Sequence, residues 1–171
     1  MMIKKIFIAK ESSAEQEPFN KVCLTAKNGI VGDRYYSSDK CPEKNISLIE
    51  IEEINAYNEK HKQQIKLNDT RRNIITQGIR LNELVNKTFY IGAVEFFGTE
   101  LCEPCAELGD RLKTASMSKQ DVIKAFTHKG GLRATIITDG ILEIGMAFTL
   151  SSPSTLDSHN NRQHHEKHQI N

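Results

Sequence analysis

The sequence lacks an excess of either charge, because 23 lysines and arginines are balanced by 22 aspartates and glutamates, for a net charge of +1. A nearly neutral chain has no broad electrostatic surface for nucleic acid or membranes, so we expect neither as a partner. No window contains 18 apolar residues, and therefore no membrane-spanning helix is predicted. The first ten residues interrupt a short apolar run with lysines, unlike a signal peptide, and we expect a cytoplasmic protein.

Cysteine is also scarce, with four residues in 171. A cytosolic chain keeps its thiols reduced, which favours chemistry or metal binding over structural disulfides. A chain of this length buries roughly 70% of its unfolded surface and needs no such cross-link to fold. We expect one domain over residues 1–151. Residues 152–171 are polar and rich in histidine, and they predict a disordered tail.

Short apolar runs separated by glycine and polar turns dominate the rest of the chain. They predict about eight strands and two helices, which favours a mainly β fold, a closed or nearly closed antiparallel β-barrel. Residues 11–20 are expected to be a polar connection, and residues 37–44 a polar turn containing Cys41. The strands are expected at residues 2–9, 22–26, 45–49, 70–76, 88–91, 94–97, 134–138 and 141–144.

Local signals locate the helices and one hairpin. Residues 50–61 have an apolar stripe at helical spacing, and residues 78–85 suggest one helical turn. Ser118 and Asp121 resemble a capping box that begins a helix. Asp139-Gly140 between two β-branched runs predicts a tight hairpin.

Two of the cysteines, Cys102 and Cys105, form a Cys-Glu-Pro-Cys motif directly after a predicted strand. The proline stiffens the turn, so we expect both thiols at the end of the strand. The pair is half of a zinc site, but Cys23 and Cys41 are isolated and the tail histidines would bind metal weakly. A thioredoxin-like pair would begin a helix, and residues 106–109 are too short and glycine-ended to predict one. Burial of both thiols as small apolar side chains is the remaining alternative.

Basic residues form a second candidate site. Alternation along the strand predicted at residues 70–76 places Arg71 and Asn73 on one face, where they suit a phosphate or carboxylate. Arg72 would then point away as a solvated side chain. Asp33-Arg34 is either a weak surface ion pair or a second anion clamp. The Gly130-Gly131-Leu-Arg133 stretch either ends a helix or lets the backbone approach an anion, and the helix end is the more common use.

The order of these motifs resembles a small stand-alone MOSC domain, the domain found at the C-terminus of molybdenum cofactor sulfurases. The resemblance covers roughly residues 20–150 and implies a β-barrel core. It is carried by Gly29-x-x-Gly32-Asp33-Arg34, Arg71-Arg72-Asn73-Ile74, Phe89-x-Ile-Gly92, Leu101-Cys102-Glu-Pro-Cys105 and Gly130-Gly131-Leu-Arg133.

The resemblance also implies a site. In relatives such as the mitochondrial amidoxime-reducing component, the second cysteine of the motif ligates molybdenum, and it matches Cys105. The pterin phosphate is bound by an arginine that matches Arg71, with Asn73 beside it, and the arginine matching Arg34 also contacts the cofactor. Arg133 completes the candidate cofactor-binding residues. A thiolate suits a soft-ligand metal, and arginines neutralise a phosphate.

Three functions follow as expectations. The first is binding of molybdenum cofactor and reduction of small N-hydroxylated compounds with electrons from a partner reductase. The second is a sulfur carrier, non-catalytic by itself, in which Cys105 accepts sulfane sulfur as a persulfide from a cysteine desulfurase. Nothing in the chain resembles the pyridoxal-phosphate domain of the long sulfurases, so that cofactor would belong to the partner. The third is a structural zinc module.

Overall fold

The computed structural model describes residues 1–37 and 45–152. Cys41 and nearly all of the expected tail lie outside the described residues. The elements occur in the order β1 (Met2–Ile8), β2 (Glu17–Phe19), β3 (Lys21–Thr25), β4 (Gly29–Ile30), β5 (Ile46–Glu50), α1 (Ile51–His61), η1 (Leu67–Thr70), β6 (Ile74–Gln77), η2 (Leu81–Leu84), β7 (Thr88–Ile91), β8 (Val94–Leu101), α2 (Ala106–Leu112), α3 (Lys119–Phe126), β9 (Leu132–Ile136), β10 (Gly140–Glu143) and β11 (Phe148–Thr149).

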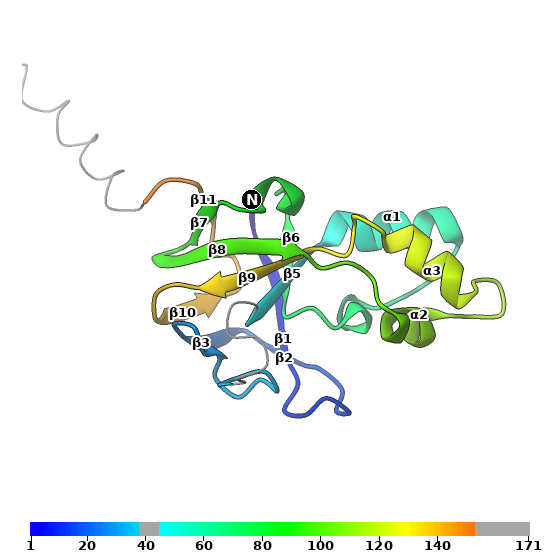
Figure 1. Cartoon of the computed structure of the whole chain (residues 1–171), viewed down its shortest axis with the longest axis horizontal. Helices are drawn as coiled ribbons and strands as arrows, with labels where there is room; N and C mark the ends of the chain where they lie inside the picture. Colours follow the sequence, from blue (N-terminus) through cyan, green and yellow to red (C-terminus); the bar gives the residue numbers. More distant parts are fainter. Residues whose placement is uncertain (38–44, 153–171) are drawn as a thin grey trace, which may run out of the picture.

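The strands form a strongly curled but open barrel, with the helices gathered at one end of the molecule (Figure 1). Eight strands pair in the order β11-β7-β8-β9-β5-β6-β1-β2, and β10-β3-β4 form a second, three-stranded sheet. The two ends of the large sheet curl toward each other, since Phe148 N donates to Met1 O at 3.3 Å. The predicted barrel-like, mainly β fold is confirmed. One pair departs from the antiparallel expectation, because β5 and β6 run parallel on either side of α1 and η1.

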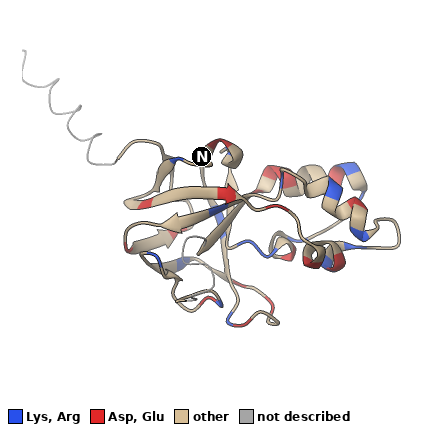
Figure 2. Ribbon diagram, viewed as in Figure 1, with Lys and Arg blue, Asp and Glu red and all other residues tan. Residues whose placement is uncertain are grey.

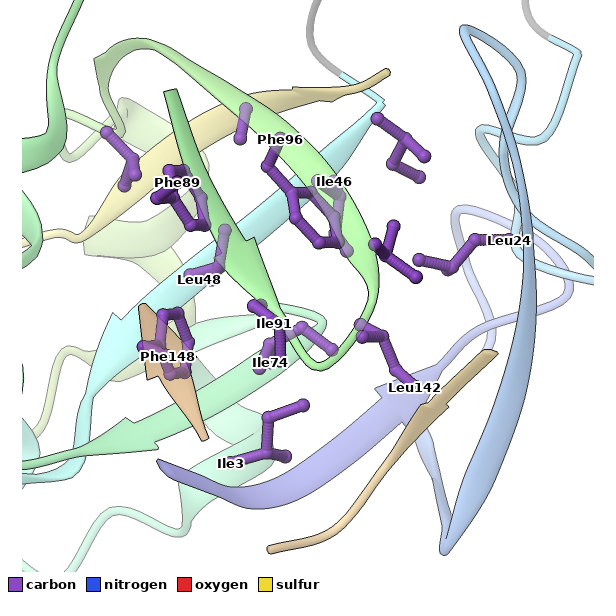
Figure 3. Close-up of a cluster of buried hydrophobic side chains, with 14 of the residues drawn as sticks. Ile3, Leu24, Ile46, Leu48, Ile74, Phe89, Ile91, Phe96, Leu142 and Phe148 are labelled. Atoms are coloured by element: carbon purple, nitrogen blue, oxygen red, sulfur yellow. The ribbon is translucent and has the colours of Figure 1, made fainter. Parts of the chain in front are cut away.

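The inside of the curled sheet is the main hydrophobic core (Figure 3). Side chains on a strand alternate between its two faces, and alternate apolar residues therefore point inward. Ile6, Leu48 and Ile74 are fully buried there, from three neighbouring strands. Phe89 and Phe96 stack on the same interior with ring centroids 5.3 Å apart.

The outward face of the same strands is covered by the helices. Phe7, Ile49 and Ile75 follow the inward residues by one position and join a second buried cluster with the helical side chains. β5 and β6 are consequently apolar on both faces, which explains why their sequences show weak alternation. Tyr57 of α1 stacks on Phe126 of α3 within this layer, at 4.7 Å between ring centroids.

Several helix predictions are confirmed. The helix predicted for residues 50–61 is α1 at Ile51–His61. The capping box forms with aspartate in place of glutamate, because Ser118 Oγ accepts a hydrogen bond from Asp121 N and the Asp121 carboxylate accepts one from Ser118 N. The Ser118 hydroxyl also donates to the Asp121 carboxylate at 2.6 Å, and this bond, followed by the one from Ser118 N, lowers the pKa of Asp121. The predicted single turn near residue 80 is η2.

The predicted hairpin at Asp139-Gly140 is wrong. β9 pairs with β5 and β8 in the large sheet, whereas β10 pairs with β3 in the small one. The turn contacts the end of β3 instead, because the Asp139 carboxylate accepts a hydrogen bond from Ala26 N at 2.7 Å. An Asp-Gly pair therefore makes the bend without bringing its flanking strands together.

Two further boundaries differ from the predictions. The polar connection expected at residues 11–20 contains β2, which pairs with β1. The side chains of β2 are exposed and show no apolar pattern by which the strand could be predicted. Residues 106–109, judged unable to form a helix, begin α2, which continues to Leu112. Gly109 is buried in α2, where a Cβ would crowd Lys119 at the start of α3. Close helix packing accounts for a glycine that we expected to end the element.

Among the residues that the structure describes, no helix is long and apolar enough to cross a membrane.

Candidate functional site

A cavity of about 290 Å³ opens where the curled sheet meets the helical layer. Figure 2 shows basic segments in this region, between the strands and the helices. Five arginines and one glutamate are among the described residues that line it, which makes the cavity strongly basic although the whole chain is nearly neutral. The lining residues are Ser12, Arg34, Tyr35, Asn45, Ile46, Ser47, Thr70, Arg71, Arg72, Asn73, Cys102, Cys105, Glu107, Leu108, Arg111 and Arg133.

The two cysteines of the motif occupy different environments in this cavity. Cys105 is exposed and precedes α2 as its N-cap residue. Cys102 is only 2% exposed, and its Sγ accepts a hydrogen bond from Arg133 Nε at 3.3 Å. Of the two cysteines that line the cavity, Cys105 is thus the accessible one and Cys102 is buried.

Two glycines hold the backbone around Cys102. Cys102 N donates to Gly131 O at 2.7 Å, and a Cβ on Gly130 would collide with the Cys102 carbonyl oxygen. Gly131 has a φ of +96°, and a Cβ there would collide with the Leu48 carbonyl. The Gly-Gly pair does not end α3, which has already ended at Phe126. It lets the backbone before β9 pass between the Cys102 segment and β5.

Arg71 and Arg72 both reach the cavity, which corrects the predicted strand alternation. β6 begins only at Ile74, and Arg71 adopts a left-handed φ of +60° at the end of η1. This turn breaks the alternation, so consecutive side chains line the same cavity. Arg72 is not the solvated side chain we expected. It donates to the carbonyl oxygens of Gly130 at 2.9 Å, Thr70 at 3.0 Å and Cys102 at 3.2 Å.

Arg34 is enclosed by the cavity wall, with a side chain only 8% exposed. Its guanidinium carbon lies 4.6 Å from the centroid of the Tyr35 ring, and its Nη1 is buried without a hydrogen-bond partner. The Asp33 carboxylate is 4.0 Å away, too far for a hydrogen bond. A buried guanidinium nitrogen without an acceptor is costly, and an anion in the cavity would supply that acceptor.

Asn73 lines the cavity but its amide is fully engaged in the fold. Its Nδ2 donates to Phe7 O at 3.3 Å and to the Asp33 carboxylate at 3.2 Å. Its Oδ1 accepts from the backbone N and the hydroxyl of Ser47 at 3.2 Å and 2.9 Å. Asn73 therefore ties β1, β5 and the Asp33-Arg34 loop together at the cavity wall.

The remaining arginines add charge from the opposite walls. Arg133 lies on β9 and faces Glu100 at 3.4 Å, while Arg111 lies on α2 with Glu15 at 3.7 Å. Burial, followed by the charges of Arg34 and Arg111, lowers the pKa of Arg71. That shift reports guanidinium groups close enough to repel one another, which a bound anion would relieve.

The structure brings all the sequence-predicted site residues to one cavity: Arg34, Arg71, Asn73, Cys105 and Arg133. The prediction underestimated two others. Arg72 was expected at the surface, and Arg111 was given no place in the site, although both line the cavity. Cys105, Leu108 and Arg111 are spaced by three residues, and this spacing would have put them on one face had α2 been predicted.

The other candidate metal ligands are not assembled in the described part of the chain. Residues 1–37 and 45–152 contain no group of three or more histidine, cysteine, aspartate or glutamate side chains able to hold an ion. Cys23 is exposed on β3 and does not line the cavity.

A family model described as MOSC domain matches residues 32–149. Among solved structures, the YuaD protein from Bacillus subtilis is similar with a TM-score of 0.74 and 17% identity, over 86% of this chain and 94% of that one. YiiM from Geobacillus stearothermophilus has a TM-score of 0.67 and 15% identity, covering 98% of this chain and 86% of its own. YiiM from Escherichia coli has a TM-score of 0.66 and 16% identity, covering 89% and 70%. The comparison with curated proteins found no match.

Proposed function

Because the chain belongs to the MOSC domain family, we propose that its arginine-lined cavity binds the molybdenum cofactor, with Cys105 as the protein ligand of the metal. The observation that carries the proposal is the exposed Cys105 sulfur in a cavity with five guanidinium groups. A soft thiolate and forked cationic donors are the two ligand types that such a cofactor, a metal centre with a phosphate-bearing pterin, requires.

The residues present fit this group on their own chemistry. Among the described residues, the buried Arg34 Nη1 has no hydrogen-bond acceptor, and the pKa of Arg71 is lowered chiefly by burial and then by its cationic neighbours. Both conditions are those of a site built for an anion. Arg34 and Arg71 would hold the phosphate, Arg133 would keep the Cys102 sulfur in place, and Asn73 would position the Asp33-Arg34 loop.

When bound, the cofactor would supply a metal centre that passes electrons to the substrate. For an N-hydroxylated substrate, two electrons and two protons give the amine and water, and a partner reductase supplies the electrons. The chain's residues would bind and orient the substrate and the cofactor. Glu107, two residues after Cys105, adds a carboxylate to the cavity wall.

A second function, sulfur transfer, is favoured by the exposure of Cys105. Its thiolate would attack the terminal sulfur of a cysteine desulfurase persulfide, forming a new S–S bond as the partner's thiolate leaves. The arginines would stabilise the resulting persulfide anion. A sulfur carrier has no need of five guanidinium groups, and we therefore favour cofactor binding.

Metal analysis tests the proposal. The chain is expressed in a host that makes the cofactor, and molybdenum per chain is measured by elemental analysis. We expect a stoichiometric amount in the wild-type chain, its loss in Cys105→Ala, and its retention in Cys23→Ala, a control that removes an exposed thiol outside the cavity. Arg71→Gln should lower the molybdenum content.

The alternatives give different results in the same preparation. A metal-free chain that gains the mass of one sulfur atom on Cys105 when incubated with a desulfurase and cysteine would support the carrier function instead. One zinc per chain, retained in place of molybdenum, would contradict both functions.

A further inference from the structure

Residues 11–16, which we call the strap, lie between β1 and β2, contribute Ser12 to the cavity lining and contact arginines that line the cavity. Arg71 donates through Nη1 to Ala14 O and through Nη2 to Ser12 O, the latter at 2.9 Å. Two of the five N–H donors of this guanidinium are thus used by neutral carbonyl oxygens of the strap. An anion that takes a forked contact with both Nη1 and Nη2 would compete with these bonds.

The strap also carries a carboxylate to the site. Glu15 Oε1 lies 3.7 Å from Arg111 Nη1, and the Glu15 charge partly opposes the effects of burial, Arg34 and Arg111 on the pKa of Arg71. Glu15 therefore lies near two of the arginines that line the cavity. Its side chain is 79% exposed, so the attraction is screened and weak.

The strap has one firm end. Gln16 is 4% exposed and its Nε2 donates to Arg72 O at 3.3 Å. Residues 11–13 are exposed, and Ala14 N bonds only within the strap, to Glu11 O at 3.2 Å. The part that lines the cavity can consequently move while the junction with β2 stays fixed.

We propose that, in the ligand-free chain, Glu15 occupies the position beside Arg111 that an anionic group of the ligand takes on binding. The ligand displaces the strap and binds Arg71 and Arg111 together. This rests on the proposed function, since it concerns the same cavity. It adds Arg111 as an anion-binding residue. In a hydrogen bond from a guanidinium to a phosphate both donor and acceptor are charged, whereas the strap carbonyl oxygens are neutral acceptors. The bonds to a phosphate are therefore stronger, and the exchange favours the ligand.

The test uses inorganic pyrophosphate as the probe and titration calorimetry at fixed ionic strength on the purified, metal-free full chain. Glu15→Gln should bind pyrophosphate about two- to fivefold more tightly than the wild-type chain, since a competing exposed carboxylate is removed. Glu11→Gln is the matched control, because it removes the same charge from the exposed start of the strap. It should stay near the wild-type affinity, and Arg111→Gln should bind more weakly.

Hydrogen exchange measured by mass spectrometry tests displacement directly. Saturating pyrophosphate should speed exchange in the strap and slow it in α2. Equal effects of the two glutamate variants, no binding by Glu15→Gln, or slower exchange in the strap would each overturn the inference. A chain that never acquires molybdenum but shows the expected difference between the two variants would contradict the proposed function alone.

Discussion

At the scale of single residues, the site depends on glycines that permit backbone contacts no other residue allows. Gly131 and Gly145 both have positive φ values, +96° and +90°. They differ in surroundings, because a Cβ on Gly131 would collide with the Leu48 carbonyl and a Cβ on Gly145 would meet nothing within 4 Å. The pair therefore separates backbone strain from crowding.

We expect Gly145→Ala to lower the free energy of unfolding by about 1–2 kcal/mol, the cost of a left-handed alanine. Gly131→Ala should lower the free energy of unfolding by about 1–3 kcal/mol more than Gly145→Ala does, because overpacking adds to the backbone strain. Urea denaturation of both variants measures the difference. Equal losses would show that the segment before β9 relaxes freely, and that Gly131 is not needed to hold Cys102.

The sequence predicted only part of the role of Asn73. Its position beside two arginines suggested a ligand contact. The structure shows its amide used in four hydrogen bonds to three other segments. No local pattern reports bonds to Phe7 and Asp33, which lie 66 and 40 residues away.

At the scale of elements, Glu50 joins the end of β5 to η2. Its side chain is 7% exposed, and its Oε1 accepts a hydrogen bond from Leu81 N at 2.9 Å. Burial raises the pKa of Glu50, against the opposing effects of the Leu81 bond and Arg80. The folded chain therefore holds this proton more tightly than the unfolded chain.

The raised pKa of Glu50 determines the direction in which stability changes with pH. A carboxyl whose folded pKa is raised loses stability as pH rises from its unfolded value through the folded one. We expect the stability of the wild-type chain relative to Glu50→Gln to fall as the pH rises above about 4.5, the ordinary glutamate pKa, as measured by urea denaturation. Glu59→Gln, which removes an exposed charge from α1, the helix that follows Glu50, is the control. A difference from Glu50→Gln that does not change with pH would contradict the prediction.

At the scale of the whole molecule, the site depends on the contact between two cores. The interior of the curled sheet and the helical layer share the strands β1, β5 and β6, and α2 carries Cys105 and Arg111 on the helical side. Leu112 of α2 is buried in the helical layer, and Leu142 of β10 is buried in the sheet interior.

Replacing either leucine by alanine should lower the free energy of unfolding by about 2–5 kcal/mol. Leu112→Ala should also lower molybdenum content per folded chain, since it loosens the helix that presents the ligand. Leu142→Ala should keep its metal, because β10 contributes no residue to the cavity. Equal metal loss in both would show that retention follows overall stability rather than the position of α2.

The sequence by itself determined the mainly β class, the positions of α1 and α3, the family, and five of the residues that line the cavity. These depend on periodicity, capping and motif order, which are local properties of the chain. Only the tertiary structure decided the separation of β9 from β10, the existence of α2, and the shared cavity of Arg71 and Arg72. Each of these depends on contacts with distant segments, whose energies outweigh the local preferences of Asp-Gly, a mid-helix glycine and strand alternation.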